Sequence, residues 1–397
     1  MRREHEIAVR LLPALAVVLI CACASSPRNL TPAAGASAGS GSMSAQTAAY
    51  VYVSSAPQGG SAHQIEAYAA AANGALTPVP GSPFQQDATG LAAAGSHLFA
   101  VNSDGYDIAS YSIAADGSPA YQSTTHVSTA GDCNTLGQLF VDRSGANLYA
   151  LNYRGSGCAN NNYESLAIDA SSGALTALGG SAANNWLSNP ASFSGNNAYA
   201  YSAACVNDTY WGIYGFSRGS GGLLTQIQIA AAPPAAPSGT FYCPSASAAD
   251  AAGDVAIAMQ PVTKQSFSSA GAAQIAAYTV EANGNLAAAG GGAGPQTQAG
   301  AVSDLKFSAA GAWLAVSGSQ GLEVMHFSAA GATPFTGLLT KDAIDQSFWD
   351  GQNHLYAISK AAGKLYVFTV TASGAAAAPG SPYAVSQPGN LAVTPVQ

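Results

Sequence analysis

Seven copies of a short hydrophobic strand recur along the chain, and they constrain its fold more than any other feature. Each copy is about five residues long and combines small residues with aliphatic or aromatic ones. The copies are AYVYV (Ala49–Val53), HLFAV (His97–Val101), NLYAL (Asn147–Leu151), NAYAY (Asn197–Tyr201), DVAIA (Asp254–Ala258), AWLAV (Ala312–Val316) and HLYAI (His354–Ile358). A repeat of roughly 40–60 residues that contains several short strands predicts the blades of a β-propeller.

A turn that contains glycine follows each of these strands. Glycine accepts positive φ without a clash at Cβ, so each turn predicts a hairpin between two outer strands of a blade. The turns are Asn73-Gly74, Asp116-Gly117, Ser172-Gly173, Gly221-Gly222, Asn283-Gly284, Ala330-Gly331 and Ser373-Gly374. In five copies an aromatic residue stands six positions before the glycine, namely Tyr68, Tyr111, Phe216, Tyr278 and Phe368.

The two ends of the repeat region complement each other. The region begins at Ala49 with a second-strand sequence, and it ends at Asn390–Pro395 with a sequence typical of a first strand. Pairing of the C-terminal strand with the N-terminal partial blade would close the ring and remove open sheet edges. We therefore predict an all-β domain over residues 49–397, a closed seven-bladed β-propeller.

The N-terminal residues are typical of an export signal. Arg2, Arg3 and Arg10 precede or border the apolar run Leu11–Ile20, which is short for a membrane span. Cys23 follows small Ala22, which indicates a lipobox, a signal peptide over residues 1–24 and lipidation at Cys23. Ordinary cleavage after the Ala-Cys-Ala segment is the alternative. Residues 25–48, rich in Ser, Ala, Gly and Pro, predict a flexible tether, so we expect an extracytoplasmic, lipid-anchored envelope protein.

Charge excludes some classes of ligand. The formal net charge is −8 and only 8% of residues are charged, so no basic surface for nucleic acid is expected. Of the 12 Lys and Arg residues, three precede Cys23, which leaves nine in the rest of the chain. Among these, only Arg154 and Lys264 fall clearly in loops between second and third strands. A pocket for a phosphate dianion is therefore not expected.

Four cysteines remain after the signal region: Cys133, Cys158, Cys205 and Cys243. An even number in an exported chain favours disulfides. We prefer Cys133–Cys158 with Cys205–Cys243, which join segments near in the chain. Cys158–Cys205 with Cys133–Cys243, and Cys133–Cys205 with Cys158–Cys243, stay open as alternatives. A metal site is weakly supported, because no CxxC pair is present.

In a propeller the loops between second and third strands share one face with the connections between blades, and function is expected there. A polar set of residues falls in these loops. Its members are Asn152, Arg154, Asn160, Asn161, Trp186, Asn207 and Asp208. Amides beside an aromatic ring suit a sugar or a peptide. The alternative is ordinary turn chemistry with a buried Trp186.

Three carboxylates stand where first strands begin, at Asp87, Asp304 and Asp345. If these residues ring the mouth of the channel, they could hold a divalent cation. The alternative is that they are solvated turn residues. No other cofactor is expected.

Several segments of the repeat region resemble the bacterial lactonase family of seven-bladed propellers, whose best-known members are 6-phosphogluconolactonases. These segments are YVYVSS (Tyr50–Ser55), ANGALTPVPGSPF (Ala72–Phe84), FSAAGAWLAVS (Phe307–Ser317) and TASGAAAAPGSPY (Thr371–Tyr383). The resemblance runs from about Ala49 to the C-terminus. It implies the propeller fold and, for active members, lactone hydrolysis.

The chain departs from this family at the catalytic motif. Active members carry a Pro-Arg-His segment before a first strand, but the corresponding segment here, Ala301–Phe307, has neither Arg nor His. No catalytic residue is carried over. We expect a binding or scaffold propeller whose partner is a small molecule, a glycan or an envelope protein, attached to the membrane only through a lipid. An extracytoplasmic lactonase acting on an unphosphorylated lactone is the alternative.

Overall fold

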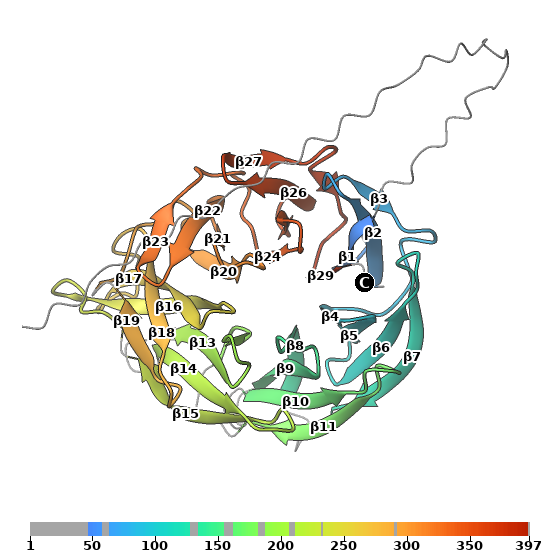
Figure 1. Ribbon diagram of the computed structural model, residues 1–397, viewed down its shortest axis with the longest axis horizontal. Coiled ribbons are helices and arrows are strands. Elements are labelled where there is room, and N and C mark those ends of the chain that lie inside the picture. Colours follow the sequence, from blue (N-terminus) through green and yellow to red (C-terminus); the bar gives the residue numbers. More distant parts are fainter. Residues whose placement is uncertain are drawn as a thin grey trace, which may run out of the picture. The chain divides into compact units, whose positions relative to one another are not determined.

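The computed structural model describes residues 47–57, 63–127, 134–154, 162–181, 187–205, 211–231, 233–289 and 292–395. These residues belong to one compact unit, Ala45–Gln397. Within them every regular element is a β-strand, and no helix long and apolar enough to cross a membrane occurs there. The unit consists of seven sheets arranged in a ring, as Figure 1 shows.

Each sheet is a blade of antiparallel strands, numbered here by its order around the ring. Blade 1 contains β29 (Leu391–Pro395), β1 (Thr47–Ser55), β2 (Gln64–Ala71) and β3 (Leu76–Pro78). Blade 2 contains β4 (Gly90–Ala94), β5 (His97–Val101), β6 (Asp107–Ile113) and β7 (Pro119–His126). Blade 3 contains β8 (Asn134–Val141), β9 (Asn147–Arg154), β10 (Asn162–Ile168) and β11 (Leu175–Gly180).

The other four blades follow the same order. Blade 4 contains β12 (Ser192–Phe193), β13 (Tyr199–Cys205), β14 (Trp211–Arg218) and β15 (Leu224–Ala231). Blade 5 contains β16 (Thr240–Ala249), β17 (Asp254–Thr263), β18 (Gln274–Val280) and β19 (Leu286–Ala289). Blade 6 contains β20 (Val302–Phe307), β21 (Trp313–Gly318), β22 (Gly321–Ser328) and β23 (Gly331–Pro334). Blade 7 contains β24 (Gln346–Trp349), β25 (His354–Ser359), β26 (Lys364–Thr371), β27 (Gly374–Ala377) and the short β28 (Tyr383–Ala384).

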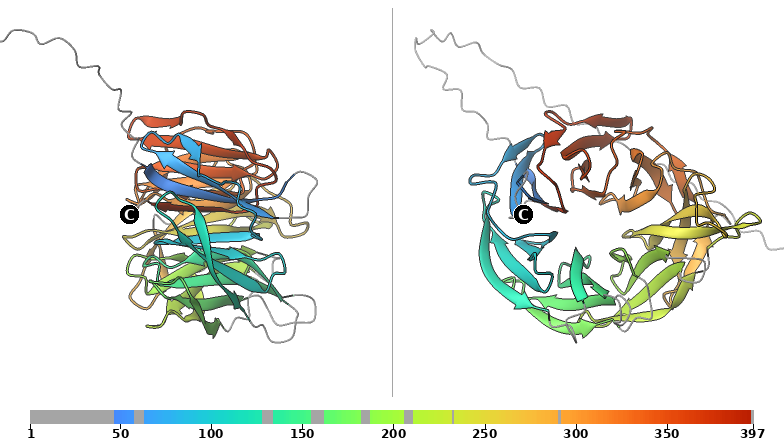
Figure 2. Two further views of the ribbon diagram at one scale, coloured as in Figure 1. Left: turned by 90° about the vertical axis from the view of Figure 1, so that its right-hand side faces the viewer. Right: turned by 180° about the vertical axis from the view of Figure 1, so that it is seen from behind.

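The predicted seven-bladed fold is confirmed, and so is closure of the ring by the C-terminal strand. β29 pairs with β1 in antiparallel register from Leu391 opposite Val53 to Pro395 opposite Ala49. The same strand is also held by its neighbours, because Leu391 N donates to Oε1 of Gln346 in blade 7 at 2.8 Å. Figure 2 shows the closed ring from behind, with the first strand of each blade innermost.

The hydrophobic core is divided among the interfaces between blades. One cluster joins Val51 and Leu391 of blade 1 to Leu365 and Val367 of blade 7, and all four are fully buried. Another joins Tyr52 of blade 1 to Leu98 and Tyr111 of blade 2. Small alanines alternate with these large side chains, which lets neighbouring sheets pack closely.

Five of the seven repeated turn glycines lie where one blade meets the next, whereas Gly331 and Gly374 have no neighbour within 4 Å of a Cβ position. All seven have positive φ, from 69° at Gly173 to 145° at Gly374. At Gly284 a Cβ atom would lie 2.4 Å from the Tyr199 ring of the preceding blade. Glycine is therefore required at this turn both by backbone conformation and by the neighbouring aromatic ring.

Candidate functional site

A cavity of about 250 Å³ lies on the axis of the ring. The innermost strands of all seven blades contribute to its wall, through residues such as Ala92, Gln138, Ser192, Ser247, Lys306, Gln346 and Val393. Consecutive residues line it in several of these strands, such as Gln138–Val141 in β8 and Ala392–Val393 in β29. Polar side chains from several blades therefore converge on this cavity.

Lys306 is one of two cations in the described lining of this site. Its Nζ lies 3.3 Å from Oδ1 of Asp304, two residues earlier in β20. The other carboxylate oxygen of Asp304 accepts hydrogen bonds from N and Oγ of Ser347 at 2.9 and 3.3 Å. Nζ of Lys306 also lies 5.2 Å from the centre of the Phe348 ring. Lys306 is thus fixed in place while some of its N–H donors remain directed at the cavity.

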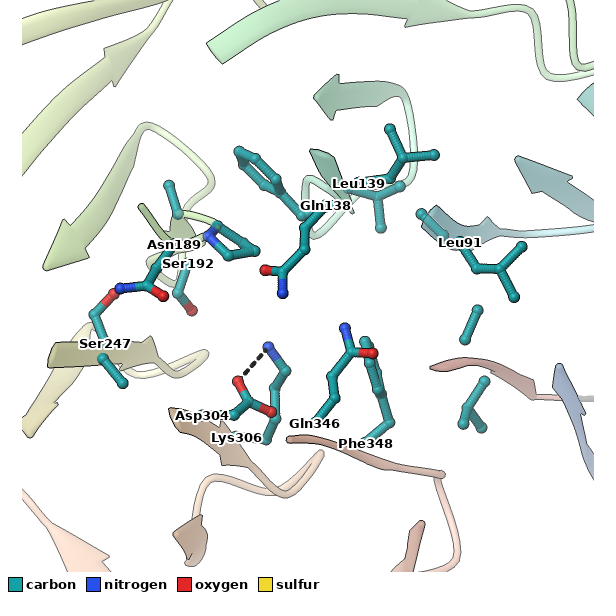
Figure 3. A pocket seen from close by; sticks show the side chains of 18 of the residues that line it. Leu91, Gln138, Leu139, Asn189, Ser192, Ser247, Asp304, Lys306, Gln346 and Phe348 are labelled. Atoms are coloured by element: carbon teal, nitrogen blue, oxygen red, sulfur yellow. Dashed lines mark ion pairs between the residues drawn. The ribbon is translucent and has the colours of Figure 1, made fainter. Parts of the chain in front are cut away.

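Two carboxamides converge on Lys306, Gln346 from beside it and Gln138 from the opposite side of the cavity. Figure 3 shows Gln138, Gln346 and Lys306 pointing toward one another. Oε1 of Gln346 accepts the hydrogen bond from Leu391 N at 2.8 Å, which leaves its NH₂ group for the cavity. Each carboxamide carries both donors and an acceptor, so the pair suits a ligand with hydroxyl or carbonyl groups.

Asn189 is held rigidly at the wall. Its Nδ2 donates to the carbonyl oxygens of Ala203 and Ser245 at 3.0 and 2.7 Å. Its own backbone carbonyl accepts from the hydroxyls of Tyr163 and Ser202. These contacts fix the side chain with Oδ1 as an acceptor at the cavity, beside Ser192 and Ser247 (Figure 3).

Arg143 contributes the second cation of the lining, from the turn that follows β8. Its backbone N donates to Oδ1 of Asn197, and its Nη1 lies 3.5 Å from the carbonyl oxygen of Ala249. Arg143 and Lys306 are balanced by Asp304 and Asp345, so the described lining carries no net charge. Such a lining favours a neutral ligand over a phosphate ester.

The three carboxylates predicted at the channel mouth have different positions. Asp304 and Asp345 line the cavity, whereas Asp87 accepts hydrogen bonds from N and Oγ of Ser103 in an exposed loop. Oδ2 of Asp345 accepts from Lys360 N at 2.8 Å. Across the ranges that the structure describes, no three His, Cys, Asp or Glu residues form a group that could hold a metal ion. Binding of a divalent cation stays a prediction.

Of the polar residues predicted to lie in loops, only Asn152 and Arg154 belong to a strand that the structure describes, β9. Asn152 is fully buried, and its Nδ2 donates to Oε1 of Glu164 at 2.9 Å, which ties β9 to β10. Arg154 is the last residue of β9. The other members, Asn160, Asn161, Trp186, Asn207 and Asp208, lie outside the described residues.

One predicted disulfide is confirmed. Cys205 at the end of β13 bonds to Cys243 in β16, with 5.4 Å between the two Cα atoms. This bond excludes both alternative pairings, since each assigned Cys205 to another partner. Cys133 and Cys158, the other predicted pair, and Cys23 lie outside the described residues.

Lys306, Gln138 and Gln346 were not among the sequence candidates. The signal for Lys306 was present, because Asp304 and Lys306 alternate with apolar Leu305 in a predicted first strand. Gln138 carried no such signal. The register of β8 shifts between Leu136 and Leu139, and this irregularity alters the simple alternation that a sequence argument assumes.

Comparisons with known proteins agree on the fold. No family model matches the chain, and no curated protein matches it. The periplasmic gluconolactonase of Pseudomonas aeruginosa aligns with a TM-score of 0.61 at 16% identity, over 88% of this chain and 99% of that one. A proposed 6-phosphogluconolactonase from Bacteroides fragilis aligns with a TM-score of 0.59 at 14% identity, over 88% and 99%.

A proposed 6-phosphogluconolactonase from Bacteroides uniformis gives a TM-score of 0.60 at 13% identity, over 88% of this chain and 100% of that chain. The fold is that of the lactonase-like propellers. The predicted resemblance is thereby confirmed for the architecture. Because one fold hosts many activities, function has to be argued from the cavity itself.

Proposed function

We propose that the protein is an exported, lipid-anchored binding propeller whose central cavity holds a small, neutral, polar ligand. Lys306 and the two carboxamides supply hydrogen-bond donors, and Asp304, Asp345 and Asn189 supply acceptors. Leu91, Leu139 and Val393 provide an apolar wall. A mostly apolar wall with a few fixed polar groups is the usual design of a small-molecule site.

One observation supports binding over hydrolysis. Among the described lining residues there is no histidine, and the two carboxylates already accept hydrogen bonds from Ser347 and from Lys360. Asp304 is in addition paired with Lys306. The two carboxylates keep lone pairs that can accept from ligand hydroxyls, but the described lining lacks histidine, the side chain most often used as a general base for water.

A thermal-shift screen tests this proposal on purified full-length protein. The probes are glucono-1,5-lactone, mono- to tetrasaccharides, and Ca²⁺ or Mg²⁺. Binding of any probe raises the melting temperature by mass action. We expect a saccharide or lactone to raise it, and we expect the shift to disappear in Lys306→Met. No shift with any probe, or an unchanged shift in Lys306→Met, would count against the proposal.

Export and anchoring rest on the N-terminal sequence. The basic residues, the apolar run and Ala22-Cys23 support cleavage before Cys23 and lipidation of its thiol. In cells fed labelled palmitate, the wild-type chain should be labelled and Cys23→Ala should not. The matched control is Cys21→Ala, which should keep the label. Label retained in Cys23→Ala would refute the assignment.

Hydrolysis of an unphosphorylated lactone is the second candidate. It is favoured by the fold shared with the Pseudomonas aeruginosa gluconolactonase and by the Asp304–Lys306 pair in the cavity. The assay follows glucono-1,5-lactone and 6-phosphogluconolactone above their spontaneous hydrolysis. A kcat/KM above about 10⁴ M⁻¹s⁻¹, the low end for ordinary enzymes, would establish this candidate in place of the binding function.

A further inference from the structure

Tyr153 does not line the cavity, but its ring contacts two residues that each directly precede a lining residue. Tyr153 lies in β9, where it pairs with Thr135 of β8, and 37% of its surface is exposed. One side of the ring covers Gly137, where a Cβ atom would lie only 2.3 Å from the ring. Gly137 directly precedes Gln138, whose carboxamide points into the cavity (Figure 3).

A second contact fixes this ring at the same rim. The Tyr153 hydroxyl donates to the carbonyl oxygen of Ser188 at 3.3 Å. Ser188 directly precedes Asn189, which lines the cavity. The ring therefore bridges blade 3 and the connection into blade 4. Because Gly137 has no side chain, an edge of the ring can approach the strand closely, and 37% of the Tyr153 surface remains exposed.

We propose that the ligand is the end of a neutral glycan, with its terminal sugar in the cavity and the next sugar on Tyr153. This inference rests on the proposed binding function and adds the class of ligand. Sugar hydroxyls both donate and accept, which matches the carboxamides of Gln138 and Gln346 and the Asp304–Lys306 pair. An aromatic ring offers the apolar surface that the C–H face of a sugar needs.

The size of the cavity supports an extended ligand. Its volume of about 250 Å³ is below the roughly 300–1,000 Å³ of sites that enclose drug-sized ligands. One sugar unit is an appropriate occupant for such a volume, and further units must then lie outside it. Tyr153 is partly exposed and contacts Gly137 and Ser188, the residues that precede the lining residues Gln138 and Asn189, so we expect the second unit there.

Isothermal titration of full-length protein tests the proposal. The probes are four pairs, each a monosaccharide and its tetrasaccharide: glucose with cellotetraose, glucose with maltotetraose, N-acetylglucosamine with chitotetraose, and mannose with mannotetraose. In at least one pair we expect the tetrasaccharide to bind about 3–10-fold more tightly than the monosaccharide, the range for one added aromatic contact. Equal affinities within every pair that binds would overturn the glycan-end proposal and leave the binding function intact.

Three variants separate the role of the ring from effects on folding. Tyr153→Ala should lower tetrasaccharide affinity to that of the monosaccharide, whereas Tyr153→Phe should retain it. Tyr121→Ala is the matched control, because Tyr121 is 57% exposed on the outer strand β7. If Tyr153→Ala binds the tetrasaccharide as wild type does, the ring is not a subsite. If no saccharide and no lactone binds the wild-type protein, both the glycan and the binding function are refuted.

Discussion

The hydroxyl of Tyr149 in blade 3 donates a 2.7 Å hydrogen bond to the carbonyl oxygen of Gly222 in blade 4. The same contact recurs between blades 1 and 2, from Tyr52 to Gly117, and between blades 4 and 5, from Tyr201 to Gly284. In each case a second-strand tyrosine bonds to the turn glycine of the next blade. The repeated glycine thus marks contacts between blades as well as hairpins.

Substitution of turn glycines should reveal this double role. Gly253→Ala, in the turn between β16 and β17, has only the backbone to strain, since its φ is 93° and nothing lies within 4 Å of its Cβ position, and the expected cost is about 1–3 kcal/mol. Gly284→Ala carries a similar strain and also meets the Tyr199 ring at 2.4 Å, which should add about 1–3 kcal/mol. Chemical denaturation measures both. Equal destabilisation of the two variants would show that the contact between blades contributes nothing.

Removal of the C-terminal strand should open the ring. Deletion of residues 390–397 removes β29 with its fully buried Leu391 and exposes the edge of β1. We expect a fall in melting temperature well above 2 °C, because a lost strand costs several kcal/mol in a large domain. Deletion of only Val396 and Gln397 is the control, since β29 ends at Pro395. A melting temperature within about 2 °C of the parent would contradict closure.

The cysteines should form two bridges. Peptide mapping without reduction should recover Cys205 joined to Cys243, as in the structure. It should also recover Cys133 joined to Cys158, which stays a prediction from the sequence. Alkylation of the native protein should then find no free thiol among these four. Two thiols that react at Cys133 and Cys158 would refute the second bridge.

Buried tyrosines should make the fold sensitive to high pH. Burial raises the pKa of Tyr111, Tyr149 and Tyr278 to about 12, against an ordinary value of 10.0. In the unfolded chain these hydroxyls lose their protons near pH 10, whereas the folded chain retains them, so the unfolded state binds fewer protons. The free energy of unfolding should therefore be steady below pH 10 and fall between pH 10 and 12. Denaturant titrations that give the same value across this interval would contradict the expectation.

The sequence predicted the architecture better than the site, for physical reasons. The turn glycines and the segment Asn390–Pro395 are local sequence patterns. The first predict hairpin turns and the second predicts a strand, without knowledge of the rest of the fold. The cavity depends on seven inner strands that are distant in sequence. Gln138 reaches it through an irregular register in β8 that no local alternation predicts. Asn152 was predicted to bind a ligand from a loop, but it lies in β9 with its side chain buried. There it donates to Glu164 on the neighbouring strand β10.

Gln138 offers the most direct test of the central claim that the axial cavity binds a neutral ligand. Its carboxamide points into the cavity (Figure 3), and it makes no side-chain hydrogen bond with the residues that the structure describes, so Gln138→Ala should fold normally. The measurement is isothermal titration of the saccharide and lactone probes into wild type and Gln138→Ala. We predict saturable binding by wild type that weakens about 5–10-fold in the variant, the loss of roughly one hydrogen bond. Binding of identical affinity in both proteins would place the ligand elsewhere and contradict the account.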